Sequence, residues 1–119
     1  MPIRPIGGVL DNTKLQTLIK NANDVGHDLA RTHTTGRPVS ATMKADVRTV
    51  LGAYPKAVAL TQNPRFQSGA SKMVLKNALK YLTNLYALAT FVKVDNLPIQ
   101  LQTKMTPTQL KDLIARELV

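Results

Sequence analysis

The residues with the clearest potential for chemistry are two histidines and the aspartates beside one of them. His27 and His33 are six residues apart, and Asp24 and Asp28 flank the first histidine. A metal site on a helix prefers two ligands four residues apart and a third from elsewhere, and we expect His33 in a loop. Because the chain has no cysteine, a zinc–thiolate site, a disulfide scaffold and a cysteine nucleophile are excluded. We therefore expect no metal and no other cofactor.

Groups for acid–base or nucleophilic catalysis are also scarce. Glu117 is the only glutamate, and no second acidic cluster accompanies Asp24 and Asp28, as a di-metal site in a helical bundle would require. No serine lies in a nucleophile-elbow motif. We expect the protein not to be an enzyme, and we assign no catalytic residue.

The most regular charge pattern is a row of lysines. Lys72, Lys76 and Lys80 are four residues apart, so they stack along one side of a predicted helix. Lys44 and Arg48 repeat this spacing earlier in the chain. Like charges at this spacing weaken a helix slightly, so helix stability does not explain the arrangement. The row is either an ordinary solvated face or a ridge that docks on an acidic surface.

The chain as a whole is strongly basic. It has 16 Lys and Arg against 7 Asp and Glu, and its formal charge is +9, which favours nucleic acid, an anionic membrane surface or an acidic protein face as partner. Few aromatic residues and no tryptophan weigh against base stacking on single strands. The polar loop at residues 32–40 is too long for a helix-turn-helix. Contact with the phosphates of a duplex stays open.

A proline inside the second predicted helix is the other unusual feature. Pro55 removes a backbone donor and clashes with the preceding turn, and Gly52 loosens the same place. We expect a kink or break near residues 53–54. This corner is either a tolerated bend between packed helices or a place where Tyr54 or Lys56 meets a partner.

Four amphipathic segments must position these residues. Apolar side chains recur at helical spacing in each of them. The helices are expected at about residues 12–31, at 41–62 with the interruption at the proline, at about 70–92, and from 107 onward. Asp11 should cap the first helix, and Ser68 or Ser71 the third. Thr106 and Gln109 form a capping box for the last.

The predicted fold is all-α: an antiparallel four-helix bundle with a proline-kinked second helix. Residues 11–119 form this single domain, and residues 1–10 form an extended N-terminal arm. We expect the second and third helices at the centre.

The segment after the third helix has a strand-like pattern, because Leu97, Ile99 and Leu101 alternate with polar residues. A lone strand would lack a partner, so an extended segment or short helix is expected. The apolar face of the last helix comprises Leu110, Leu113, Ile114 and Leu118.

The most apolar run of the chain, residues 71–92, is expected to be a core helix. Lys80 would lie close to the centre of a membrane span, where a charge is costly. The uncharged part, residues 81–92, would extend about 18 Å as a helix, too short for a hydrocarbon core of about 30 Å. We therefore expect no transmembrane segment. No secretory signal is visible at the N-terminus.

Three segments between residues 41 and 97 carry a family resemblance: ADVRTVLGAYPK, FQSGASKMVLKNALKYLTNLYAL and DNLP. This region resembles the small lumenal extrinsic proteins of photosystem II. The resemblance implies a basic four-helix bundle in the thylakoid lumen that docks on the acidic lumenal face of the complex and is not an enzyme. The chain departs from the family in lacking the lipid-attachment cysteine of some bacterial members and a visible transit peptide. By the resemblance, the docking residues would be Lys72, Lys76, Lys80, Lys44 and Arg48.

These patterns predict a non-catalytic accessory or assembly subunit that docks through a basic face on an acidic surface of a larger complex. Photosystem II is the complex that the resemblance implies; without the resemblance, the expected compartment is the cytoplasm. The alternative is a sequence-independent nucleic-acid-binding or packaging protein. Basic side chains in one concave stripe would favour nucleic acid, whereas basic residues beside exposed apolar residues would favour a protein. The expected partner-binding residues are Lys72, Lys76, Lys80, Lys44, Arg48, Tyr54 and Lys56.

Overall fold

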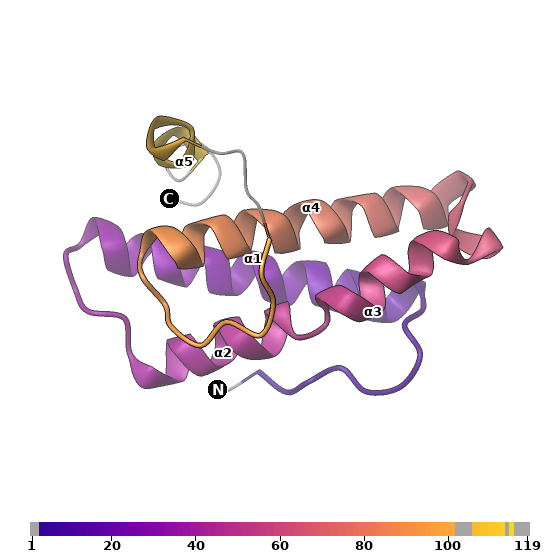
Figure 1. Ribbon diagram of the computed structural model, residues 1–119, viewed down its shortest axis with the longest axis horizontal. Coiled ribbons are helices and arrows are strands. Elements are labelled where there is room, and N and C mark those ends of the chain that lie inside the picture. The colour runs from indigo at the N-terminus through magenta and orange to yellow at the C-terminus, as the bar shows by residue number, and fades with distance from the viewer. Residues whose placement is uncertain (1–2, 102–105, 114, 116–119) are drawn as a thin grey trace.

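The computed structural model describes residues 3–101, 106–113 and 115, and all regular elements in this part of the chain are helices (Figure 1). The α-helices are α1 (Asn12–Thr34), α2 (Ala41–Leu51), α3 (Tyr54–Ala59), α4 (Gly69–Phe91) and α5 (Pro107–Leu113), and two short 3₁₀ turns, η1 (Leu60–Gln62) and η2 (Pro64–Phe66), join α3 to α4. The all-α prediction is confirmed. Residues 97–101 contain no strand and no helix.

Helix α1 begins where the sequence predicts and ends later. The carboxylate of Asp11 accepts a hydrogen bond from the backbone N–H three residues further on, at 2.8 Å, and so caps the helix. The helix continues past Arg31 to Thr34. Two residues later, Gly36 has a φ of +72°, which lies outside the helical region. His33 therefore lies in the last turn of α1, and its expected place in a loop was wrong.

The second predicted helix is divided into α2 and α3. The hydroxyl of Ser40 caps α2, which ends before Gly52 and Ala53; both of these residues keep right-handed helical backbone angles. Pro55 lies in the first turn of α3. Backbone N–H groups in the first turn of a helix have no acceptor within the helix, so the missing N–H of proline removes no helical hydrogen bond there. The two helices consequently follow one another along the same side of the molecule (Figure 1).

Helices α1 and α4 lie side by side and run in the same direction. Near their first turns the Asn12 amide donates to the Ser71 hydroxyl at 3.1 Å. Near their last turns the rings of His33 and Phe91 meet edge to face, with centroids 5.1 Å apart. The chain between them returns through α2 and α3 in the opposite direction (Figure 1). Ser71 thus joins the two helices, while Ser68 occupies the cap position of α4 without a capping hydrogen bond.

The core is centred on the pair α1 and α4. Helix α4 contacts every other α-helix of the described chain, and its most extensive interface is with α1. The sequence predicts the second and third helices at the centre, but the second predicted helix, α2 with α3, has the smaller interface with α4. The reason is length: α1 and α4 have 23 residues each and bury seven apiece, whereas α2 buries three and α3 one. Long apolar stripes remove the most surface from water when they face each other.

The apolar run at residues 71–92 is therefore core, as predicted. It supplies most of α4, including Leu75, Leu82 and Leu88, which are all buried. Among the helices that the structure describes, none combines the length and the hydropathy needed to cross a bilayer.

The N-terminal arm is extended and packs against the helices. Ile3 donates its backbone N–H to the carboxylate of Asp46 on α2, at 2.9 Å. Ile6 is partly buried against the core, and Leu10 is one of its buried members. The arm therefore runs beside α2 and α3 before it joins α1 (Figure 1).

Helix α5 opens with the predicted capping box. Thr106 donates its backbone N–H to the Gln109 side chain at 3.0 Å, and Gln109 donates its own N–H to the Thr106 hydroxyl at 3.2 Å. Leu110 and Leu113 form a small separate cluster with α4. Figure 1 shows α5 end-on while α1 to α4 lie across the view, so α5 crosses the outer side of α4. The other predicted members of its apolar face, Ile114 and Leu118, lie outside the described residues.

The core assignment predicts a large effect for one truncation on α4. Leu82 is 0% exposed, so Leu82→Ala should lower the free energy of unfolding by about 2–5 kcal/mol through lost burial and a cavity. Urea denaturation followed by circular dichroism measures this change. Met73→Ala on the same helix is the control, because Met73 is 56% exposed and should change stability by less than about 0.5 kcal/mol. Equal losses in both variants would contradict the assignment.

Candidate functional site

The lysine row lies on the exposed N-terminal half of α4. Lys72, Lys76 and Lys80 are all exposed. Within the described part of the chain, none of the three forms an ion pair. At a rise of 1.5 Å per residue the row is about 12 Å long. It presents three cations that pair with no carboxylate among the residues that the structure describes.

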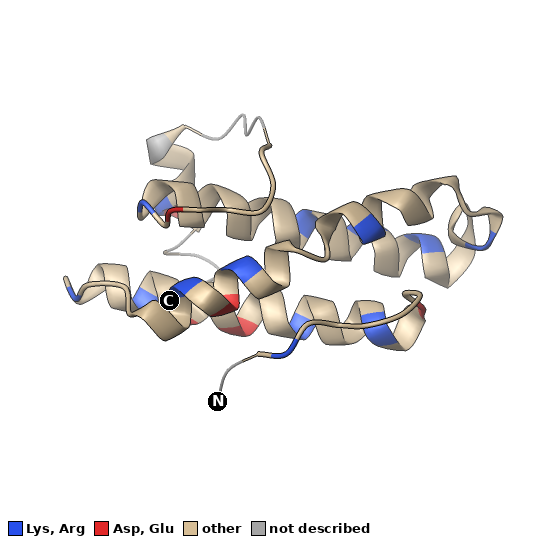
Figure 2. Ribbon diagram, turned by 60° about the horizontal axis from the view of Figure 1, so that its bottom comes forward, with Lys and Arg blue, Asp and Glu red and all other residues tan. Residues whose placement is uncertain are grey.

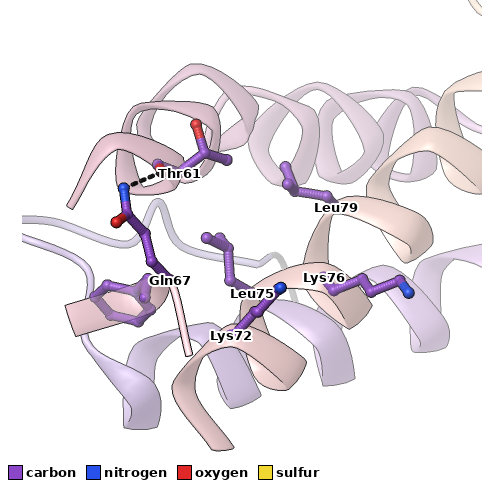
Figure 3. A pocket seen from close by; sticks show the side chains of 7 residues that line it. Thr61, Gln67, Lys72, Leu75, Lys76 and Leu79 are labelled. Atoms are coloured by element: carbon purple, nitrogen blue, oxygen red, sulfur yellow. Dashed lines mark hydrogen bonds between the residues drawn. The ribbon is translucent and has the colours of Figure 1, made fainter. Parts of the chain in front are cut away.

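A groove of about 380 Å³ runs beside this row, between α4 and the turns that precede it. Figure 3 shows Leu75 and Leu79 pointing into the space between the two walls, with Lys72 and Lys76 along the α4 edge. The groove thus joins an apolar floor to a cationic edge. Its lining residues are Thr61, Phe66, Gln67, Lys72, Leu75, Lys76 and Leu79.

The opposite wall of the groove is shaped by the turns η1 and η2. The side chain of Asn63 accepts the backbone N–H of Arg65 at 3.0 Å and opens η2. Gln67 donates its side-chain amide to the carbonyl of Thr61 at 3.4 Å across the turn. Phe66 is buried and anchors the turn in the core. These local bonds hold the wall in place beside the start of α4.

An exposed methionine borders the other side of the lysine row. With 3.6 residues per turn, side chains on a helix take a defined order around its circumference. On α4 that order is Leu75, Leu79, Lys72, Lys76, Lys80 and Met73. Because Met73 is 56% exposed, the cationic row is flanked by apolar side chains on both sides.

The second basic pair lies elsewhere and has a partner. Arg48 donates two hydrogen bonds to the backbone carbonyl of Asp95, at 3.0 and 2.9 Å, and one to its carboxylate at 2.8 Å. The ammonium group of Lys44 lies 3.9 Å from the same carboxylate. Since Asp95 follows the C-terminal end of α4, Lys44 and Arg48 lie toward the opposite end of that helix from Lys72. The five basic residues therefore do not form one continuous face.

Asp95 belongs to a segment that crosses α2 after α4 ends. The backbone takes left-handed angles at Lys93 and Asn96, with φ of +62° and +55°. These angles turn the chain so that Val94 is buried and Leu97 packs against the core. The sequence offers no signal for the contact, because Asp95 and Arg48 are 47 residues apart.

The two residues of the proline corner face different surroundings. Tyr54 is partly buried and packs against the core. Lys56 is exposed and lines a second groove of about 240 Å³, together with Pro5 and Ile6 of the N-terminal arm. Of the two residues, Lys56 is the more accessible to a partner, and a partner-binding role of either stays a prediction.

The residues considered for metal binding and catalysis are engaged in other contacts. Asp24 pairs with Lys20 at 2.9 Å, and Asp28 lies 4.0 Å from Arg31. His33 packs against Phe91 as described above. Over the described residues, no three His, Cys, Asp or Glu side chains lie close enough together to hold a metal ion. Figure 2 shows Lys and Arg residues on the helices, the turns and the N-terminal arm.

No protein-family model, curated protein or solved structure matches this chain. The resemblance to the lumenal extrinsic proteins of photosystem II therefore stays a prediction. The site is interpreted from its own geometry: a cationic row, an adjacent apolar groove and an exposed methionine.

The contacts of Arg48 predict a stabilising role for this residue. Arg48→Met removes all three hydrogen bonds to Asp95, and the free energy of unfolding should fall by about 1 kcal/mol, the upper range for an exposed pair. The matched control is Lys20→Met, which breaks a single exposed pair within α1 and should cost about 0.3–0.5 kcal/mol. Urea denaturation measures both. An Arg48→Met protein as stable as the control would contradict the role.

Proposed function

We propose that this protein is a non-catalytic accessory or assembly subunit that docks through the lysine row of α4 on an acidic surface of a larger complex. One observation carries the proposal: Lys72, Lys76 and Lys80 are exposed and form no ion pair within the described chain. Like charges four residues apart weaken their own helix. Carboxylates of an acidic partner would attract all three lysines and offset the repulsion between them.

The apolar borders of the row favour a protein over a nucleic acid. Lysines that neutralise phosphates need no apolar surface beside them. Protein interfaces combine charged groups with an apolar centre, and here the groove residues Leu75 and Leu79 lie beside the row. The row comprises all the basic residues of α4, and the other described Lys and Arg residues lie on α1, α2, α3, α5, the turns and the arm, where Figure 2 shows them spread over the molecule.

The proposal includes the architecture and a first candidate partner. In this proposal the successive long passes of the chain, α1, α2 with α3, and α4, alternate in direction and form the antiparallel bundle, with a bend at Pro55 and with α5 as a short fourth helix. The resemblance to the lumenal extrinsic proteins makes photosystem II the first complex to test and the thylakoid lumen the corresponding compartment.

A second candidate function is sequence-independent binding of nucleic acid. The formal charge of +9 supports it, because phosphate contacts release counterions and need only well-placed cations. This function would use basic residues all over the surface and not the row in particular.

Charge reversal of the row tests the proposal. Lys72→Glu/Lys76→Glu/Lys80→Glu should weaken binding to photosystem II membranes stripped of extrinsic proteins by about 10- to 100-fold, because three ion pairs of about 0.5–1 kcal/mol each are lost. Co-sedimentation measures this affinity. The matched control is Arg37→Glu/Lys93→Glu/Lys111→Glu, three exposed positions outside the row whose reversal lowers the charge of +9 by the same six units. It should retain most of the affinity.

The same proteins are then titrated with a random-sequence DNA duplex in an anisotropy assay. The proposal predicts that the row variant and the control bind DNA equally, with the weakening that their shared net charge imposes. Tight, salt-sensitive DNA binding without membrane binding would contradict the proposed docking function and favour the nucleic-acid function. Equal loss of membrane binding in both variants would show that the affinity depends on the net charge of the protein and not on the lysine row.

A further inference from the structure

The side chains on the N-terminal half of α4 repeat at one distance. Lys72, Lys76 and Lys80 are four residues apart, as are Leu75 and Leu79. Four residues correspond to about 6 Å along a helix axis. A ligand that lies along α4 and repeats carboxylates and aliphatic groups at the same distance would pair with both rows at once.

The groove suits side chains inserted from outside better than a small molecule. The groove is more open than enclosed, and Leu75 and Phe66 at its floor are themselves buried. A small ligand site usually buries most of its ligand's surface among apolar side chains. Lys72 and Lys76 line the groove, whereas Lys80 and the exposed Met73 lie outside it. A ligand that contacts the whole lysine row must therefore extend beyond the groove along α4.

The other half of α4 already binds a helix on its outer side. Leu110 and Leu113 of α5 pack against Ala87 and the partly buried Phe91. Ala87 is seven residues after Lys80, which places it on the same face of α4 as the lysine row. Helix α5 therefore covers the C-terminal part of the face whose N-terminal part is exposed.

We propose that the lysine row and the groove together bind an amphipathic helix of a partner protein. Aliphatic side chains of this helix enter the groove above Leu75 and Leu79, and its Glu or Asp residues, four apart, pair with Lys72, Lys76 and Lys80. An extended peptide fits less well, since it seeks backbone partners at a sheet edge, and the described residues form no strand. The inference deepens the proposed function and rests on it.

A designed peptide tests this inference directly. The probe is a fluorescent helix of about four turns with Glu at every fourth position beside a row of Leu and with Ala elsewhere. The control probe has the same composition in scrambled order, and so the same charge without the two aligned rows. Fluorescence anisotropy with the full chain should give a dissociation constant in the range of about 10–100 μM for the designed peptide and at least about tenfold weaker binding for the scrambled one.

Two protein variants distinguish the contribution of the groove to peptide binding from the contribution of the lysine charges. The row variant Lys72→Glu/Lys76→Glu/Lys80→Glu should lose the designed peptide. Thr61→Trp, at an exposed position on the groove wall, fills the groove without changing charge and should weaken the designed peptide at least about tenfold, since its aliphatic side chains lose their site. The variant Arg37→Glu/Lys93→Glu/Lys111→Glu is again the control. Far-UV circular dichroism verifies that each variant keeps its helices.

The outcomes distinguish this inference from the function on which it rests. Equal binding of the designed and scrambled peptides, or full binding by Thr61→Trp, would overturn helix docking and leave docking on an acidic surface intact. Peptide binding that is unaffected in the row variant would reject both. Displacement of the peptide by a DNA duplex, with the duplex bound equally by wild type and Thr61→Trp, would assign the row to nucleic acid instead.

Discussion

The burial of α1 and α4 against each other is the interaction on which the rest of the structure depends. These helices carry the longest apolar stripes and run in the same direction, in contact from Asn12 and Ser71 at one end to His33 and Phe91 at the other. Two parallel neighbours cannot be joined by a short turn, because the chain must travel back along their full length. The segment between them makes this return as α2 and α3. The break ahead of Pro55 falls inside the return pass, where short helices suffice because α1 and α4 already bury most of the core.

The basic pair on α2 and the lysine row on α4 share the same spacing but have different surroundings because of this arrangement. At the end of α4, the chain turns across α2 and places Asp95 beside Lys44 and Arg48. Their charges stabilise the segment that leaves the core. At the start of α4, the preceding turns contribute no carboxylate near Lys72, Lys76 and Lys80 in the described residues. The cations nearest to the groove are therefore the ones available to a partner.

The two halves of the outer face of α4 thus have different roles. Its C-terminal half is covered by α5, and its N-terminal half exposes cations between an apolar groove and Met73. An exposed apolar face would favour self-association, whereas three like charges oppose it. The lysines consequently serve two purposes in our proposal: they keep two copies of the protein apart, and they select a partner of opposite charge.

The sequence by itself determined the features that depend on neighbouring residues. Helix periodicity, the Asp11 cap, the capping box of Thr106 and Gln109 and the interruption before Pro55 are local, because each rests on contacts within a few residues. Only the tertiary structure decided which helices pair, since the contact between Asn12 and Ser71 joins residues 59 apart. It also decided that Asp95 engages Arg48 and that the groove opens beside Lys72. The spacing of the two basic rows is identical in the sequence, and their difference arises from long-range packing that no local pattern encodes.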